Sequence, residues 1–130
     1  MAYLEQLKTN SSELGNLLVF EKLLPGAIKR VYFIKDVPPN VVRGKHRHRN
    51  TWQALICISG SCKVYTNDSK TEQIFNLTTN TNCLILSPSD WHFMDNFAKD
   101  TVLMVIANDH YDINDYIDEP YSESYIKYLS

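Results

Sequence analysis

Short runs of hydrophobic residues recur along the chain, and most alternate with polar residues or are rich in β-branched and aromatic side chains. The runs are NLLVFEKL (16–23), IKRVYFI (28–34), WQALICIS (52–59), CKVYTN (62–67), EQIFNL (72–77), NCLILS (82–87) and TVLMVIAN (101–108). Turn-forming residues bound them: Pro25-Gly26, Pro38-Pro39-Asn40, Ser59-Gly60-Ser61, Asn67-Asp68 and Pro88. Strands at this spacing, with no helical pattern between them, predict an all-β sandwich or barrel, and we expect a jelly roll.

Only the C-terminal tail, from about Asp115 to Ser130, has a helical pattern. In EPYSESYIKYL one face of a helix would carry Tyr121, Tyr125 and Tyr128 or Leu129. Pro120 suits a first helical turn, where its missing N–H group costs nothing. We therefore expect a short C-terminal helical segment, in a single domain that spans residues 1–130.

Composition excludes several classes of protein. The chain is 44% hydrophobic and 22% charged with a net charge of -2, which is ordinary for a globular protein and gives no sign of a nucleic-acid partner. The start, MAYLEQLKTN, lacks the pattern of a signal peptide, and no apolar run is long enough to span a membrane. These features favour the cytoplasm. The odd cysteine count (Cys57, Cys62 and Cys83) then predicts reduced thiols.

Two histidines lie one residue apart in a basic stretch, VVRGKHRHRN (41–50). Because side chains alternate along a strand, His46 and His48 point to one face, while Arg43 and Lys45 point to the other. An inward pair of imidazoles behind a basic outer face is typical of a strand that lines a reactive cavity. The stretch on its own fits a metal clamp, an acid/base pair or a solvated surface strand.

The residues downstream of the pair resemble the two motifs of the cupin superfamily. Gln53 and Gly60 follow His46 and His48 at the spacing of the first motif, and the second motif is represented by Pro88, His92 and Asn96. The first motif usually carries a carboxylate where this chain has Gln53. A neutral amide removes the anion that helps a divalent ion to bind, although three histidines can still hold zinc.

A narrower resemblance runs almost from end to end, to the nucleotide-sugar 3,4-ketoisomerases of the cupin superfamily (WxcM-like). It rests on GNLLVFE, IKRVYFI, RGKHRHRNTWQALICISGSCKV, LILSPSDWHFMDNF and VLMVIANDHYDINDYI. The resemblance implies a jelly roll that moves the keto group of dTDP-4-dehydro-6-deoxy-D-glucose from C4 to C3, without metal or cofactor. The product would feed a 3-amino-3,6-dideoxysugar for surface polysaccharide such as O-antigen. It also implies a homodimer that exchanges N-terminal strands, within residues 1–25.

The resemblance assigns roles to individual side chains. His46 and His48 would be the acid/base pair, because imidazole takes and gives protons near neutral pH. Tyr32 would donate to a sugar oxygen, Gln53 would hydrogen-bond the enediol, and Arg43 would anchor the pyrophosphate. His92 and Asn96 would complete the substrate-binding wall. Strict alternation points Arg43 away from the histidines, and a bulge at Gly44 would bring it back.

Two alternative functions and one stereochemical question stay open at this point. A 3,5-epimerase-like cupin could act on the same substrate, and a metal-binding or non-catalytic sugar-binding cupin would keep only the fold. The chain also departs from the family at Phe33, at Phe93 and at Leu14, which precedes Gly15. The Leu14 departure leaves the C4 configuration of the product, galacto or gluco, undetermined.

Overall fold

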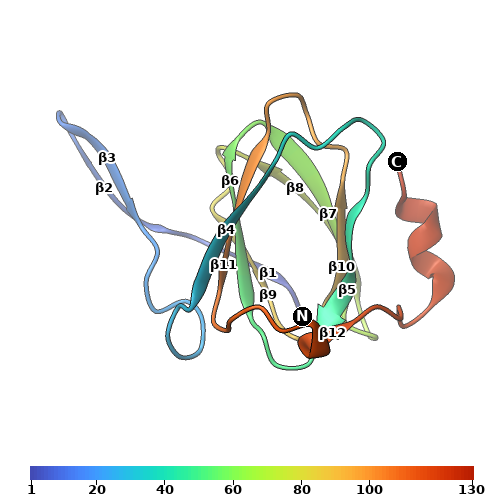
Figure 1. Ribbon diagram of the computed structural model, residues 1–130. Coiled ribbons are helices and arrows are strands. Elements are labelled where there is room, and N and C mark those ends of the chain that lie inside the picture. The colour runs from blue at the N-terminus through green and yellow to red at the C-terminus, as the bar shows by residue number, and fades with distance from the viewer.

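Two five-stranded antiparallel sheets face one another in the computed structural model, which describes residues 1–130 (Figure 1). The first sheet has the order β1 (Tyr3–Glu5), β9 (Cys83–Leu86), β6 (Gln53–Ser59), β11 (Val102–Ala107) and β4 (Arg30–Lys35). The second has the order β12 (Tyr116–Ile117), β5 (Arg43–His48), β10 (Trp91–Asp95), β7 (Ser61–Asn67) and β8 (Glu72–Thr78). This arrangement confirms the predicted all-β antiparallel sandwich.

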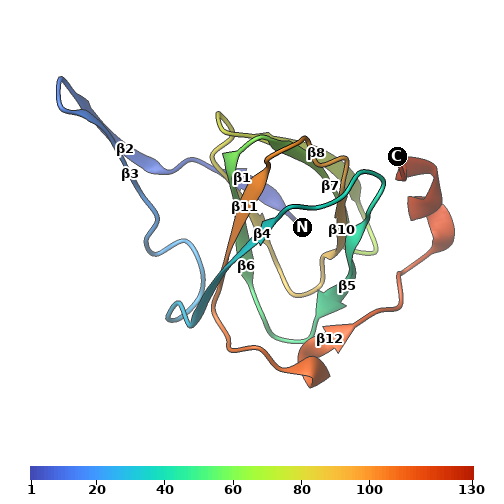
Figure 2. The same cartoon turned by 45° about the horizontal axis from the view of Figure 1, so that its top comes forward.

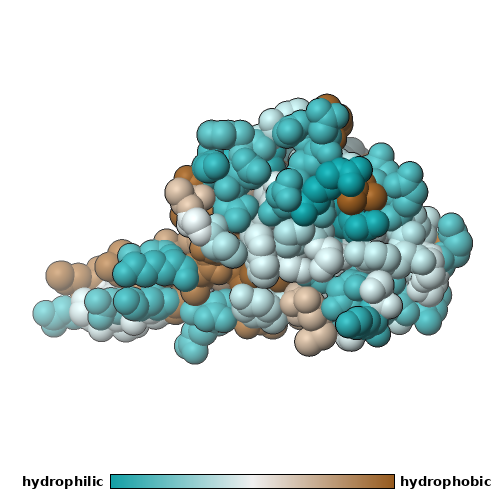
Figure 3. Space-filling model, turned by 90° about the horizontal axis from the view of Figure 1, so that it is seen from below, coloured by the Kyte–Doolittle hydropathy of each residue, from teal (hydrophilic) through white to brown (hydrophobic).

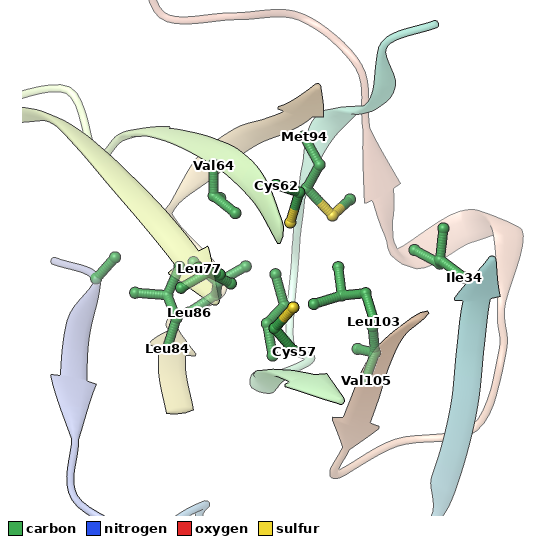
Figure 4. Packing of buried hydrophobic residues seen from close by; sticks show 12 residues of the cluster. Ile34, Cys57, Cys62, Val64, Leu77, Leu84, Leu86, Met94, Leu103 and Val105 are labelled. Atoms are coloured by element: carbon green, nitrogen blue, oxygen red, sulfur yellow. The ribbon is translucent and has the colours of Figure 1, made fainter. Parts of the chain in front are cut away.

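Alternate residues of the strands form the core between the sheets (Figure 4). On β6, Leu55 and Cys57 point inward, and Leu103 and Val105 do the same on the neighbouring β11. The second sheet and the remaining strands contribute further buried side chains: Ile34, Cys62, Val64, Leu77, Leu84, Leu86 and Met94. All three cysteines are buried and free. Every second side chain of these strands therefore faces the space between the sheets.

The outer face of the first sheet is also apolar. Ala54, Ile56 and Ile106 alternate with the core positions and are buried on this outer side. The N-terminal segment covers them with the side chains of Leu7, Phe20, Leu23 and Leu24. The N-terminal segment does not cover the outer face of β4, where Val31 and Phe33 are exposed.

A hairpin of β2 (Lys8–Ser12) and β3 (Gly15–Val19) projects from the body of the molecule and pairs only with itself (Figures 1 and 3). Leu14 at its turn is 94% exposed, and Leu17 and Leu18 on β3 are exposed as well. A two-stranded hairpin of this kind is marginally stable on its own in water.

The C-terminal tail covers the outer face of the second sheet. It contains two 3-10 helices, η1 (Ile113–Asp115) and η2 (Glu123–Tyr128). Four side chains of the tail pack against Tyr65, Trp91 and Phe93: Tyr121, Tyr125, Tyr128 and Leu129. A helical segment was expected here, but η2 begins at Glu123 with Ser122 as its N-cap, so Pro120 precedes it instead of occupying its first turn. Neither of these helices has the length and hydropathy that a membrane span requires.

Candidate active site

A cavity of about 380 Å³ takes its lining residues from both sheets and so lies between them. Figure 2 shows the positions of β4 and β5, which contribute to it from opposite sheets. Its walls come from β4, β6 and β11 of the first sheet, from β5, β10 and β12 of the second, and from Tyr111 in the connection between β11 and η1. Its volume is that of a small-molecule site. The polar and aromatic lining residues are Arg30, Tyr32, Arg43, His46, Gln53, His92, Tyr111 and Tyr116.

A β-bulge on β5 decides which side chains reach this cavity. His46 lies opposite His92 on β10, but the next residue of β10, Phe93, lies opposite Gly44, so Lys45 is the extra residue. Gly44 and Lys45 have positive φ angles of 90° and 61°. The bulge shifts the parity of the strand by one, and Arg43, opposite Met94, lines the cavity together with His46. The structure thus contains the bulge that the Arg43 assignment required.

His46 and His48 both point between the sheets, as alternation predicted, but they differ in access. His46 lines the cavity, whereas His48 is 3% exposed and is not among the lining residues. The two ring centroids are 5.1 Å apart, and Tyr116 lies 4.7 Å from the His46 ring and 4.6 Å from the His48 ring. Nδ1 of His48 shares a hydrogen bond of 2.8 Å with Oδ2 of Asp115.

His92 places a third imidazole in the same wall. Its ring centroid is 5.0 Å from that of His46, and its Nδ1 lies 3.0 Å from the backbone oxygen of Asp90. Since a carbonyl oxygen can only accept, Nδ1 of His92 carries the proton of this hydrogen bond.

Burial keeps these imidazoles neutral. Burial, together with the neighbouring His48, lowers the pKa of His46 to about 4. Burial, together with His46, lowers the pKa of His92 to about 3. At neutral pH both rings are therefore uncharged, and each has one nitrogen able to accept a proton.

The opposite wall carries a tyrosine and a glutamine that are bonded to each other. Gln53 on β6 donates from Nε2 to Oη of Tyr32 on β4 across 2.9 Å. Burial raises the pKa of Tyr32, so its hydroxyl keeps its proton. Oε1 of Gln53 is buried without a hydrogen-bond partner.

Two guanidinium groups line the cavity from opposite sheets. Arg43 comes from β5, and Arg30 comes from β4, where its Cζ lies 5.0 Å from the Tyr32 ring centroid. Neither arginine forms a salt bridge. Sequence reasoning missed Arg30, although it lies two residues before Tyr32 and alternation places both on one face. It also missed Tyr111 and Tyr116, because no strand pattern marked the segment that carries them.

Asn96, predicted to bind substrate, lies outside the cavity. Continued alternation would put it on the face of His92 and Met94, but β10 ends at Asp95. Asn96 is exposed and has a φ of 55°, so it belongs to the turn that leaves the strand. The structure therefore does not bring this residue to the others, because alternation holds only within a strand.

No group of three or more His, Cys, Asp or Glu side chains is placed to hold a metal ion. The expectation of a reaction without metal rests on the neutral Gln53 and stays a prediction.

Comparisons with known proteins give one family and a set of structural neighbours. The model of the family described as "FdtA: WxcM-like, C-terminal" matches residues 2–129. The TDP-4-oxo-6-deoxy-α-D-glucose-3,4-oxoisomerase of Aneurinibacillus thermoaerophilus is 38% identical over 118 residues, which cover 89% of this chain and 84% of that protein. The chain thus resembles an enzyme that acts on a nucleotide sugar.

Solved structures agree with this relationship. A histidine-to-asparagine mutant of the 3,4-ketoisomerase QdtA from Thermoanaerobacterium thermosaccharolyticum, in complex with TDP-4-keto-6-deoxyglucose, has a TM-score of 0.82 and 34% identity, over 98% of this chain and 93% of its own. The dTDP-4-dehydrorhamnose 3,5-epimerase of Bacillus anthracis has a TM-score of 0.74 and 12% identity, over 88% and 76% of the two chains. At that identity the epimerase is related to this chain by fold alone.

Proposed function

Because the chain belongs to the FdtA family of WxcM-like proteins, we propose that it is a TDP-4-oxo-6-deoxy-D-glucose 3,4-ketoisomerase. The observation that carries the proposal is the cavity itself. Neutral His46 on one sheet and the protonated hydroxyl of Tyr32 on the other line a single cavity of about 380 Å³. A proton acceptor facing a proton donor is what an enolisation between adjacent carbons requires.

The reaction moves two protons and leaves the oxidation state of the sugar as a whole unchanged. The C4 ketone acidifies the hydrogen on C3, and a base removes it to give an enediolate across C3 and C4. The proton of the C3 hydroxyl is lost as O3 becomes the new carbonyl oxygen. C4 and O4 each receive a proton, so the number of protons taken equals the number returned.

His46 is the imidazole that touches the sugar. It lines the cavity, and its low pKa leaves a free base at neutral pH. His48 is the second member of the pair and lies behind His46, with its Nε2 buried and without a hydrogen-bond partner. His92 forms the wall beside them.

Tyr32 and Gln53 stabilise the enediolate. Tyr32 receives a hydrogen bond from Gln53, which leaves its own proton free for a sugar oxygen that becomes negative. A hydrogen bond to a developing oxyanion strengthens as charge accumulates, so it lowers the barrier more than it strengthens substrate binding.

Arg30 and Arg43 bind the diphosphate. Planar guanidinium groups bind phosphate oxygens bidentately, and neither arginine is engaged by a carboxylate. Arg43 is exposed at the cavity, a position where a phosphate can meet it before the sugar is enclosed.

The active form is a homodimer in which the projecting hairpin of one subunit packs on the other. Two apolar surfaces support this: the exposed Leu14, Leu17 and Leu18 of the hairpin, and the exposed Val31 and Phe33 on the outer face of the first sheet. Exposing either apolar surface to water is unfavourable, and packing the hairpin of one subunit on the sheet of the other would bury both surfaces.

Product analysis tests the activity. The enzyme is incubated with dTDP-4-keto-6-deoxyglucose in D2O, and the product is examined by NMR. A 3-keto product with deuterium at C4 supports the proposal, and its C4 configuration gives the galacto or gluco outcome. Deuterium at C3 and C5 with the ketone still at C4 would indicate 3,5-epimerisation, and no exchange with no product would exclude both.

A further inference from the structure

Asp115 is a buried carboxylate outside the cavity that the mechanism has not used. It ends η1 and immediately precedes β12, the short strand that pairs with β5. Four donors surround its two oxygens. Oδ1 accepts from the backbone N–H groups of Arg49 at 3.2 Å and Asn50 at 2.8 Å. Oδ2 accepts from Oγ1 of Thr51 at 2.5 Å and contacts Nδ1 of His48 at 2.8 Å.

This arrangement keeps Asp115 ionised. Burial raises the pKa of the carboxyl group, but the hydrogen bonds from Thr51, Asn50 and His48 outweigh it and the net pKa is lowered. An ionised carboxylate only accepts hydrogen bonds, so the proton between Asp115 and His48 belongs to Nδ1 of the imidazole.

This tautomer also means that the other ring nitrogen of His48, Nε2, carries no proton. In a neutral ring with hydrogen on Nδ1, Nε2 has a free lone pair and points away from Asp115. Nε2 is buried and has no partner, and the same is true of Oε1 of Gln53. Burial lowers the pKa of His48, and the hydrogen bond with Asp115 opposes this shift without reversing it, so the ring is neutral at neutral pH.

We propose that Asp115 is a positioning residue: it holds His48 as the Nδ1–H tautomer, which leaves the lone pair of Nε2 free to accept a proton behind His46. This inference rests on the proposed function for its effect on catalysis, but the tautomer itself is a property of the free protein.

Asp115→Asn makes the idea testable because the geometry dictates where the amide goes. The backbone N–H groups of Arg49 and Asn50 can only donate, so the amide oxygen must stay on their side. The amide NH2 then faces His48, whose Nδ1 must accept, and the ring proton moves to Nε2. Nε2 is then blocked as a base, without any change in the size of the side chain at position 115.

The experiment compares wild type, Asp115→Asn and Asp112→Asn by NMR of 15N-labelled histidine and by steady-state kinetics. Asp112 is the matched control, because it lies in the same segment, is exposed, and caps η1 without touching a histidine. We expect Nδ1–H at His48 in wild type and in Asp112→Asn, and Nε2–H in Asp115→Asn. The kcat of Asp115→Asn should fall by about 10²-fold, with KM changed by less than about threefold.

Two results would overturn the inference: Nε2–H at His48 in the wild-type protein, or a kcat for Asp115→Asn within about threefold of wild type. The first needs no variant, so it decides the matter even if Asp115→Asn does not fold. The NMR measurement also needs no substrate. A wild-type protein that shows Nδ1–H but does not isomerise the sugar would therefore contradict the proposed function alone.

Discussion

Gln53 donates a hydrogen bond from Nε2 to Oη of Tyr32 across 2.9 Å, and this contact joins β6 to β4 across the intervening strand β11. Because Gln53 supplies the donor, the Tyr32 hydroxyl retains its own proton for the cavity. The raised pKa of Tyr32, caused mainly by burial, keeps that proton in place at neutral pH. Tyr32 is therefore ready to donate before any substrate is bound.

Replacing Tyr32 by phenylalanine tests that role. Tyr32→Phe removes the hydroxyl and leaves the ring, so the cavity wall stays but the enediolate loses a donor. We expect kcat to fall by about 10- to 10²-fold with little change in KM. Tyr3→Phe, on the exposed face of β1, should keep the wild-type kcat. An unchanged kcat in Tyr32→Phe would mean that the hydroxyl does not contact the reacting oxygen.

Replacing His46 tests the base. His46→Asn keeps a hydrogen-bonding side chain at the cavity but removes the proton acceptor, and we expect turnover to fall by at least about 10³-fold. Binding of dTDP, measured by calorimetry, should stay within about threefold of wild type because the diphosphate is held elsewhere. The control is His110→Asn, an exposed histidine outside the cavity. Substantial turnover in His46→Asn would transfer the role to His48 or His92.

Replacing Arg43 tests the diphosphate site. Arg43→Met keeps an unbranched apolar stem and removes the charge, so the dissociation constant for dTDP should rise by about 10- to 10²-fold. Wild-type binding should also weaken with added salt more steeply than that of the variant. Lys45→Met removes a cation from the neighbouring bulge residue, which does not line the cavity, and should bind dTDP like wild type. Equal losses in the two variants would point to general charge instead of a specific contact.

The low pKa values of His46 and His92 predict a stability that falls with acid. In the unfolded chain their imidazoles take up protons near pH 6.5, whereas in the folded protein they do so only near pH 4 and pH 3. Between these values the unfolded state binds more protons, so the free energy of unfolding decreases as the pH falls from 6.5 toward 4. Above pH 6.5 these two groups contribute no pH dependence.

The slope is measured by urea unfolding between about pH 7 and about pH 5. Most carboxylates titrate below this range, so they contribute little to the slope. His46→Asn should make the slope smaller, and His92 should account for part of what remains. A slope that survives in His46→Asn at full size would show that His46 does not contribute to it.

The exposed leucines of the hairpin predict the oligomeric state. We expect a dimer in sedimentation velocity experiments, and a monomer when Leu17 and Leu18 are both replaced by glutamate, because two charges would be buried at the interface. Lys99→Glu, at an exposed position of the turn before β11 and outside the hairpin, is the control and should remain dimeric. A wild-type monomer would exclude the hairpin exchange.

Much of the fold followed from one local rule. Leu55, Cys57, Leu103 and Val105 face the inner core at every second position, and the short β-rich runs that contain them predicted the strands. The N-terminal strands were harder to predict. The strand β2 reads KTNSS and is fully exposed, so it carries no burial pattern, and its pairing depends on β3.

Strand parity predicted that His46 and His48 share a face, whereas Tyr32 and Gln53 were assigned by the resemblance to the ketoisomerase family. Tyr32, Gln53 and His46 lie on strands, and the structure brings them to one cavity. Asp115 and Tyr116 lie in a segment without periodicity, and their place beside His48 depends on the pairing of β12 with β5, a contact between segments far apart in the sequence. The likeness between sequences could have drawn attention to the segment YDINDYI, but not to the contact.

The bulge at Gly44 and Lys45 divides β5 into two independently adjustable parts. Side chains after the bulge, such as that of His46, point the same way with or without it. Side chains before the bulge, such as that of Arg43, point into the cavity because the bulge adds one residue. A single-residue deletion there would turn Arg43 outward and leave His46 in the cavity. In evolutionary terms, the phosphate contact proposed for Arg43 and the proton transfer proposed for His46 can be gained or lost separately, through a change in length instead of a change in side chain.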